Sequence, residues 1–148
     1  MKAKPWIALV FLAAAALMGG CDSSANTLPL ASLGDISKMV KNPSGLMFQI
    51  LQPSNGRIAL AGDTIAVTYT GTLVDGTIFD SNAGKAPFIF PLGAGKVISG
   101  WDEGVAGMRV GETRKLIIPA NLGYGSANLT NIPANSTLIF VVQLLEVQ

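Results

Sequence analysis

One stretch organises the rest of the chain: Val97-Ile98-Ser99-Gly100-Trp101-Asp102-Glu103-Gly104-Val105. Ile98, Trp101 and Val105 are spaced i, i+3 and i+7, which places all three on one face of a helix. The two acids lie in its first turns, where the helix dipole favours negative charge. Gly107 is a suitable residue to end the helix. We therefore predict the only good helix of the chain from Ile98 to about Ala106.

The segments around this helix are typical of β-strands. Residues 64–73 alternate between two faces, as a half-buried strand does, and Asp75-Gly76 predicts a hairpin into residues 77–81. Further strands or extended segments are expected at 46–52, 87–92, 112–118 and 136–147, the last of them apolar on both faces like a central strand. A short helix is unstable alone. We therefore predict an α+β fold, with an antiparallel sheet of about five strands and one helix across one face.

Composition excludes several classes of function. The chain of 148 residues has no histidine and one cysteine, which removes His-based triads, the usual zinc sites and disulfides within one chain. It has no basic run, so nucleic-acid binding is not predicted. Gly93 and Gly95 precede the helix as in a phosphate loop, but Lys96 is followed by Val97 instead of Ser or Thr. We predict no metal and no cofactor.

The first 20 residues have the pattern of a secretory signal peptide. Lys2 and Lys4 precede an apolar run of about 15 residues, which is short for a membrane-spanning helix of ~20. Of the ten Lys and Arg residues these two lie here, which leaves eight against nine acids, a net charge of −1, after cleavage. A retained anchor helix is the alternative interpretation.

Cys21 follows Leu17-Met18-Gly19-Gly20, which resembles the lipobox of bacterial lipoproteins. In that family the cysteine is lipidated and becomes the new N-terminus, and its lipid chains hold the protein on the membrane. An incidental cysteine after an ordinary cleavage site is the alternative. Residues 21–44 then form a tether, and residues 45–148 form the folded domain. We expect a bacterial cell-envelope location, membrane-anchored and facing the periplasm.

A set of mostly aromatic side chains surrounds Trp101 in the expected fold. Taken singly, each of these side chains is most simply explained as a residue of the hydrophobic core. Two features argue against this explanation for the whole set. Tyr124 lies in a glycine-rich loop, and Asp80 is next to Phe79, where a buried acid would need a partner. We infer a small apolar pocket with Trp101 as its floor.

The chain resembles the FKBP-type peptidyl-prolyl isomerases over roughly residues 45–148. The segments that carry the resemblance stand in the same order and spacing: Val67-Thr68-Tyr69-Thr70-Gly71, Asp75-Gly76-Thr77-Ile78-Phe79-Asp80-Ser81, Pro87-Phe88-Ile89-Phe90, Val97-Ile98-Ser99-Gly100-Trp101, Gly104-Val105-Ala106-Gly107-Met108-Arg109-Val110-Gly111-Glu112, Tyr124-Gly125, Ile132-Pro133 and Ser136-Thr137-Leu138-Ile139-Phe140. The resemblance implies a curved antiparallel sheet wrapped around the helix, with the active site between them.

The resemblance also implies roles for individual residues. Trp101 would be the pocket floor, Phe79 would contact the substrate near the proline, Asp80 would be the polar group at the rim, and Tyr124 would hydrogen-bond a substrate carbonyl. The remaining substrate-binding residues would be Tyr69, Phe88, Val97, Ile98, Ile132 and Phe140. The family often has an arginine that meets the aspartate, whereas here only Lys85 is available. The loop after Tyr124 looks slightly shortened.

The function that this resemblance implies is prolyl cis–trans isomerisation. The barrier is amide resonance of ~18–20 kcal/mol, and an apolar pocket disfavours the planar polar amide more than the twisted one. We predict a monomeric rotamase that assists folding of exported proline-containing polypeptides, and that also takes macrolides of the FK506 and rapamycin type. The alternatives are a proline-segment-binding chaperone with weak catalysis, and a barrel for a small hydrophobic ligand.

Overall fold

The computed structural model describes residues 38–148, and these form one antiparallel sheet with a short helix on one face. The strands are β1 (Val40–Lys41), β2 (Met47–Gln52), β3 (Thr64–Thr72), β4 (Ile78–Ser81), β5 (Phe88–Pro91), β6 (Thr113–Ile118) and β7 (Leu138–Val147). The helix α2 spans Ser99–Val105, and the 3-10 helix η2 spans Ala120–Leu122.

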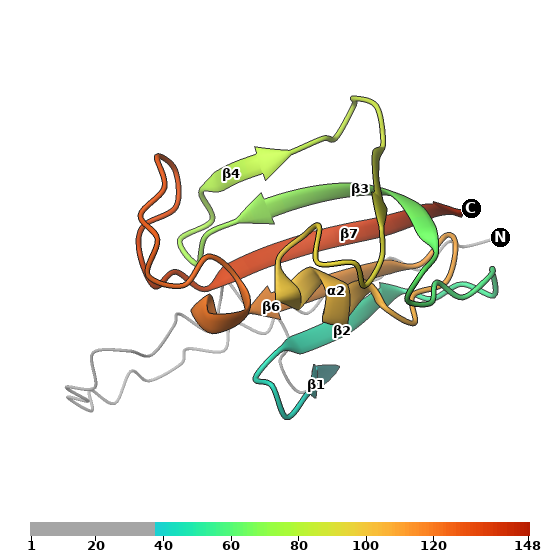
Figure 1. Cartoon of the computed structure of the whole chain (residues 1–148), viewed down its shortest axis with the longest axis horizontal. Helices are drawn as coiled ribbons and strands as arrows, with labels where there is room; N and C mark the ends of the chain where they lie inside the picture. The colour runs from blue at the N-terminus through green and yellow to red at the C-terminus, as the bar shows by residue number, and fades with distance from the viewer. Residues whose placement is uncertain (1–37) are drawn as a thin grey trace, which may run out of the picture.

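The strands are ordered β1-β2-β6-β7-β3-β4, and β5 also pairs with β3. Every pair is antiparallel. Figure 1 shows the strands side by side from β4 to β1, with α2 in front of the sheet. The predicted fold class is confirmed, although the described chain has seven strands where about five were expected. Strand β1 was missed because two residues carry no periodic pattern.

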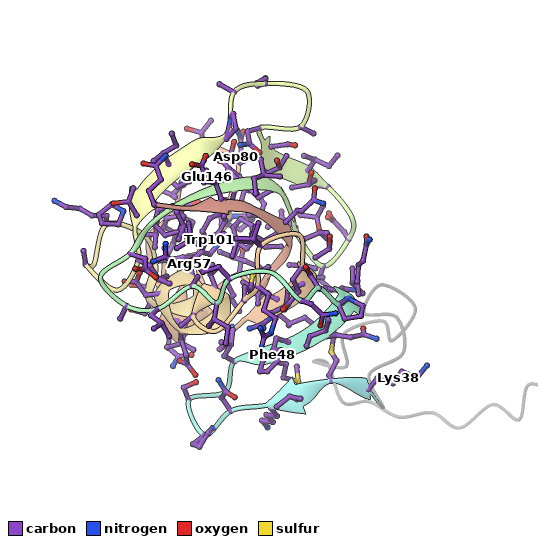
Figure 2. All side chains as sticks on the ribbon, turned by 90° about the vertical axis from the view of Figure 1, so that its right-hand side faces the viewer. Lys38, Phe48, Arg57, Asp80, Trp101 and Glu146 are labelled. Carbon is purple, nitrogen blue, oxygen red and sulfur yellow. The ribbon has the colours of Figure 1, made fainter. Side chains whose placement is uncertain are left out.

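The core lies between α2 and the sheet. Trp101 and Val105 from the helix are buried against Leu116 and Ile118 of β6 and Phe140 of β7. Figure 2 shows Trp101 inside the space that the curved sheet encloses. The helix is slightly shorter than predicted, because Ile98 and Ala106 have extended backbone angles.

Strand β7 is central, as predicted, but it is not buried on both faces. Residues 138–140 are all buried, but in residues 140–145 buried and exposed positions alternate, and Val141 and Leu145 are each 38% exposed. The physical reason is that α2 covers only one face of the sheet, so the opposite face keeps contact with solvent along the middle of β7.

Candidate functional site

The helix and the curved sheet enclose a cavity of about 430 Å³. Strands β3, β4, β5 and β7, the start of α2 and the loops before α2 and after η2 all contribute to it. Its lining residues are Tyr69, Phe79, Asp80, Phe88, Gly95, Lys96, Val97, Ile98, Trp101, Tyr124 and Phe140. The structure therefore brings together all the predicted pocket residues except Ile132.

Trp101 forms the floor of this cavity. The residue is 4% exposed, and three rings meet it edge to face, with centroid distances of 5.0 Å for Tyr69, 5.2 Å for Phe140 and 6.2 Å for Phe88. Such perpendicular packing is the arrangement that aromatic quadrupoles prefer. Within residues 38–148 the indole N–H of Trp101 has no acceptor. A buried donor without a partner is uncommon, and this N–H group is shielded from solvent.

Phe79 and Phe140 form a wall over a glycine. Their rings meet edge to face at 5.4 Å, and both lie over Gly71 of β3. A Cβ atom at Gly71 would come within 2.7 Å of each ring, so the wall requires a residue without a side chain at this point. Phe88 stands at the rim, 39% exposed and stacked on Phe90 at 5.2 Å.

A hydrogen bond joins the two polar groups of the sheet side of the pocket. The Tyr69 hydroxyl donates to Asp80 Oδ2 at 2.7 Å. Partial burial, followed by this hydrogen bond and the negative charge of Asp80, raises the pKa of Tyr69 to about 12. No ion pair joins Asp80 to Lys85 in the described part of the chain. The partner of the aspartate is therefore a phenol from the neighbouring strand.

The loop before α2 is held by a side chain of the helix itself. Asp102 accepts hydrogen bonds from the backbone N–H groups of Gly93 at 2.9 Å and Gly95 at 3.1 Å. Both glycines have positive φ, at 76° and 69°, a conformation that favours glycine. The clamp sets the path of the chain into Val97 and Ile98, which line the cavity.

Helix α2 packs closely against strand β6 through two glycines, and this close packing sets the position of Trp101. A Cβ at Gly100 would lie 2.5 Å from Ile118 Cγ2, and one at Gly104 would lie 2.8 Å from Leu116. At the end of the helix, the buried guanidinium of Arg114 donates to the carbonyl of Gly104 at 2.9 Å.

Tyr124 and Ile132, both predicted from the loop after η2, have different positions. Tyr124 lines the cavity and is 41% exposed. The N–H groups of Gly123 and Gly125 both donate to the Ala120 carbonyl, which shapes the turn around Tyr124. Ile132 is 6% exposed and packs in the main core, so it does not line the cavity. Its apolar side chain is buried by contacts within the core.

Sequence reasoning missed two lining residues, Gly95 and Lys96. In the sequence these two residues resemble only part of a phosphate loop, because a polar residue before a helix gives no local sign that it will line an apolar cavity. Among residues 38–148, no group of three or more His, Cys, Asp or Glu side chains is placed to hold a metal ion. The site therefore offers apolar walls, one carboxylate, two phenols and one amine.

Comparison with known proteins identifies relatives of this chain. Residues 56–145 match the family model described as FKBP-type peptidyl-prolyl cis-trans isomerase. The chain is 52% identical over 109 residues to FK506-binding protein 4 of Neurospora crassa, covering 74% of this chain and 23% of that protein. It is 52% identical over 110 residues to the peptidyl-prolyl cis-trans isomerase FKBP53 of Arabidopsis thaliana, covering 72% and 23%.

Two solved structures have a similar fold. The crystal structure of FkpA from Escherichia coli matches with a TM-score of 0.70 and 38% identity, over 80% of this chain and 55% of that chain. The crystal structure of AtFKBP13 matches with a TM-score of 0.67 and 36% identity, over 73% and 97%. The chain spans about a quarter of the length of the curated relatives.

The relatives contradict the predicted location. A membrane-anchored lipoprotein of the bacterial cell envelope was expected, but the curated relatives come from fungi and a plant. That prediction was wrong because it depended on the N-terminal pattern alone. No helix among residues 38–148 is long and apolar enough to cross a membrane. The predicted signal peptide, most of the tether and the lipidation of Cys21 lie outside the described residues.

Proposed function

The chain belongs to the family of FKBP-type peptidyl-prolyl cis-trans isomerases, and on that premise we propose that it accelerates cis–trans exchange at Xaa-Pro bonds of polypeptides. One observation carries the proposal: an apolar cavity with Trp101 at its floor has the hydrogen-bonded pair Tyr69 and Asp80 at one side. The chain then assists folding of proline-containing proteins. The predicted role in folding exported proteins depended on the location that the relatives contradict.

The chemistry requires neither a proton transfer nor a covalent step. Exchange is slow, taking tens to hundreds of seconds uncatalysed, because the planar amide is stabilised by resonance. The twisted transition state is less polar, and the walls of Phe79, Phe88 and Phe140 therefore favour it over the planar amide. Tyr69, Val97 and Ile98 complete the contact surface around the proline ring.

Polar groups orient the peptide while the bond twists. In this proposal Asp80 acts at the rim, held by Tyr69, and Tyr124 donates a hydrogen bond to a substrate carbonyl. Fixing the chain on both sides of the proline lowers the entropic part of the barrier. Ile132 supports the loop from within the core instead of contacting the substrate.

The proposal extends to ligands and assembly. The relatives named as FK506-binding proteins support binding of FK506 in the same cavity, and the proposal includes macrolides of the rapamycin type. Action as a monomer remains part of the proposal. We take residues 45–148 as the core of the isomerase domain, with the strand at Val40–Lys41 as an extension of its sheet.

A peptide-exchange assay tests the function. The full chain is added to a peptide with one Xaa-Pro bond, and the relaxation rate after a shift of the cis population is measured. We expect a rate above the uncatalysed one that rises in proportion to protein concentration, and that falls in Phe88→Ala and in Asp80→Val. An unchanged rate at every concentration would refute the isomerase.

A chaperone-like binding module is the second candidate, and one observation favours it. Ile78 and Ile89 are 63% and 55% exposed on β4 and β5, the strands that supply Phe79 and Phe88. Successive side chains of a strand point to opposite faces, so these two isoleucines form exposed apolar surface outside the pocket, and such surface suits unfolded chains. Suppression of aggregation of an unfolded protein without prolines separates this activity from isomerisation.

A further inference from the structure

The cavity lining contains two charged side chains that belong to different parts of the fold. Asp80 comes from strand β4, and Lys96 comes from the loop that leads into α2. The carboxylate of Asp80 accepts the hydrogen bond from Tyr69. Lys96 is exposed, and its neighbours Val97 and Ile98 are walls of the cavity. The pocket therefore offers a cation directly beside its apolar wall.

Lys96 makes no ion pair within residues 38–148. The nearest acids in sequence are engaged elsewhere. Asp102 accepts the N–H groups of Gly93 and Gly95, and Glu103 accepts hydrogen bonds from Asn42 at 2.7 Å and Ser44 at 2.6 Å. The ammonium group is consequently available to a partner from outside the chain.

The backbone that carries Lys96 is held in place. The two hydrogen bonds to Asp102 fix the turn immediately before it, and the helix begins three residues after it. A charge on a fixed backbone at the edge of a cavity acts on whatever enters that cavity. The loss of side-chain freedom on pairing is then confined to the lysine side chain itself.

We propose that Lys96 makes this pocket selective for substrates with an acidic residue within two positions of the proline. The inference rests on the proposed function, because it names the substrate class of the same cavity. The Lys96 ammonium attracts a peptide carboxylate that reaches this edge of the cavity, and it repels a peptide ammonium group. Exposed pairs of this kind contribute up to ~1 kcal/mol, which corresponds to a preference of up to about fivefold at low salt.

Asp80 is the one lining group that would act in the opposite direction. Its charge attracts cationic peptides, but one carboxylate oxygen already accepts a strong hydrogen bond, and it lies on the β4 side of the pocket. Lys96 has no such partner. The two charges therefore select different ends of the same peptide, and only the end near the α2 loop depends on Lys96.

The test uses sets of peptides that differ at one position, two residues before to two residues after the proline, with Glu, Gln or Lys. The exchange rate and the dissociation constant of labelled peptide are measured for the full chain, for Lys96→Gln and for Lys96→Glu. Lys41→Glu is the matched control, since Lys41 is an exposed lysine on β1, the edge strand opposite β4. It changes the net charge by the same amount as Lys96→Glu, and it lies outside the cavity lining.

We expect the full chain to favour Glu over Gln by about threefold to fivefold in kcat/KM or in Kd at one or more positions. The preference should shrink as salt screens it. Lys96→Gln should abolish it, Lys96→Glu should turn it toward Lys, and Lys41→Glu should keep it. Equal values for Glu and Gln at every position, or a preference that survives in Lys96→Glu, would overturn the inference.

Failure of the parent proposal is distinguishable. If peptides bind but the exchange rate stays at the uncatalysed value, the isomerase is refuted, while the Glu-to-Gln ratio of Kd still decides the role of Lys96. If the chain accelerates exchange of the Gln peptides and shows no preference for Glu in rate or affinity, only the selectivity is refuted. Absence of both binding and catalysis overturns both.

Discussion

Tyr69 performs two structural tasks with one side chain. Its ring meets Trp101 edge to face, and its hydroxyl holds Asp80 at 2.7 Å. Loss of the hydroxyl alone therefore separates the carboxylate from its anchor without emptying the aromatic cluster. Mutations of Tyr69 and Asp80 therefore test the contribution of this hydrogen bond most directly.

We expect Tyr69→Phe to lower the exchange rate and to cost about 0.5–1.5 kcal/mol in free energy of unfolding, the net value of one hydrogen bond. A double-mutant cycle with Asp80→Ala measures the coupling in both rate and stability. Because the residues interact directly, the double variant should lose less than the sum of the two single variants. Full additivity would contradict the role of this bond.

The raised pKa of Tyr69 predicts a specific dependence of stability on pH. Its pKa is about 12 in the folded protein against about 10 for an unfolded tyrosine, so the folded state holds the phenolic proton more tightly. The stabilisation is fully present below pH ~10 and is lost as pH rises toward ~12. Denaturation midpoints across this range should fall more steeply for the full chain than for Tyr69→Phe. Parallel curves would contradict the shift.

At the scale of elements, the close contact between α2 and β6 positions the pocket floor. Gly100→Ala would place a methyl group 2.5 Å from Ile118 Cγ2, and both residues are buried. We expect a loss of about 1–3 kcal/mol in stability from overpacking, together with weaker peptide binding as Trp101 moves. Urea denaturation and the exchange assay measure the two effects. Ser99→Ala, at an exposed position of the same helix, is the control and should change stability little.

A buried ion pair lies at the start of β6, and its arginine also donates to the Gly104 carbonyl at the end of α2. Arg114 and Glu112 are 7% and 4% exposed, with 2.7 Å between guanidinium nitrogen and carboxylate oxygen, and Arg114 also lies 4.7 Å from the Phe48 ring centroid. We expect Glu112→Ala to cost about 3–5 kcal/mol, because it leaves Arg114 charged and buried without its partner. Arg57→Ala breaks the exposed pair with Asp63 at 3.5 Å and should cost under ~1 kcal/mol. Thermal unfolding of both variants gives the comparison, and equal losses would contradict it.

At the scale of the whole molecule, the segment before residue 45 contributes to the fold. Strand β1 pairs with β2, and the side chains of Asn42 and Ser44 donate to Glu103 on α2. A fragment of residues 38–148 should therefore be more stable than one of residues 45–148, by about 1–3 kcal/mol for the lost hydrogen bonds. Chemical denaturation of both fragments measures the difference. Equal stability would show that residues 45–148 hold the entire folding unit.

Much of the fold was predictable from local patterns. The spacing of Ile98, Trp101 and Val105 indicated the helix, and alternation in residues 64–73 indicated a half-buried strand, because both periods follow from backbone geometry. The exposed outer face of β7 was not predictable, since Val141 and Leu145 are as apolar as buried residues. Which face α2 covers is a property of packing across the chain, and it leaves no local trace.

The helix, the hairpin at Asp75-Gly76, the aromatic set around Trp101 and the family resemblance can all be read from the amino-acid sequence, because each depends on residue types at fixed spacing along the chain. Three features follow from tertiary contacts alone: Tyr69 is the partner of Asp80, Ile132 lies in the core, and Lys96 is part of the cavity lining. These are contacts between residues distant in sequence, or orientations set by the loop that Asp102 clamps. Such contacts depend on register between strands and on the path of a loop, and a period along the chain encodes neither.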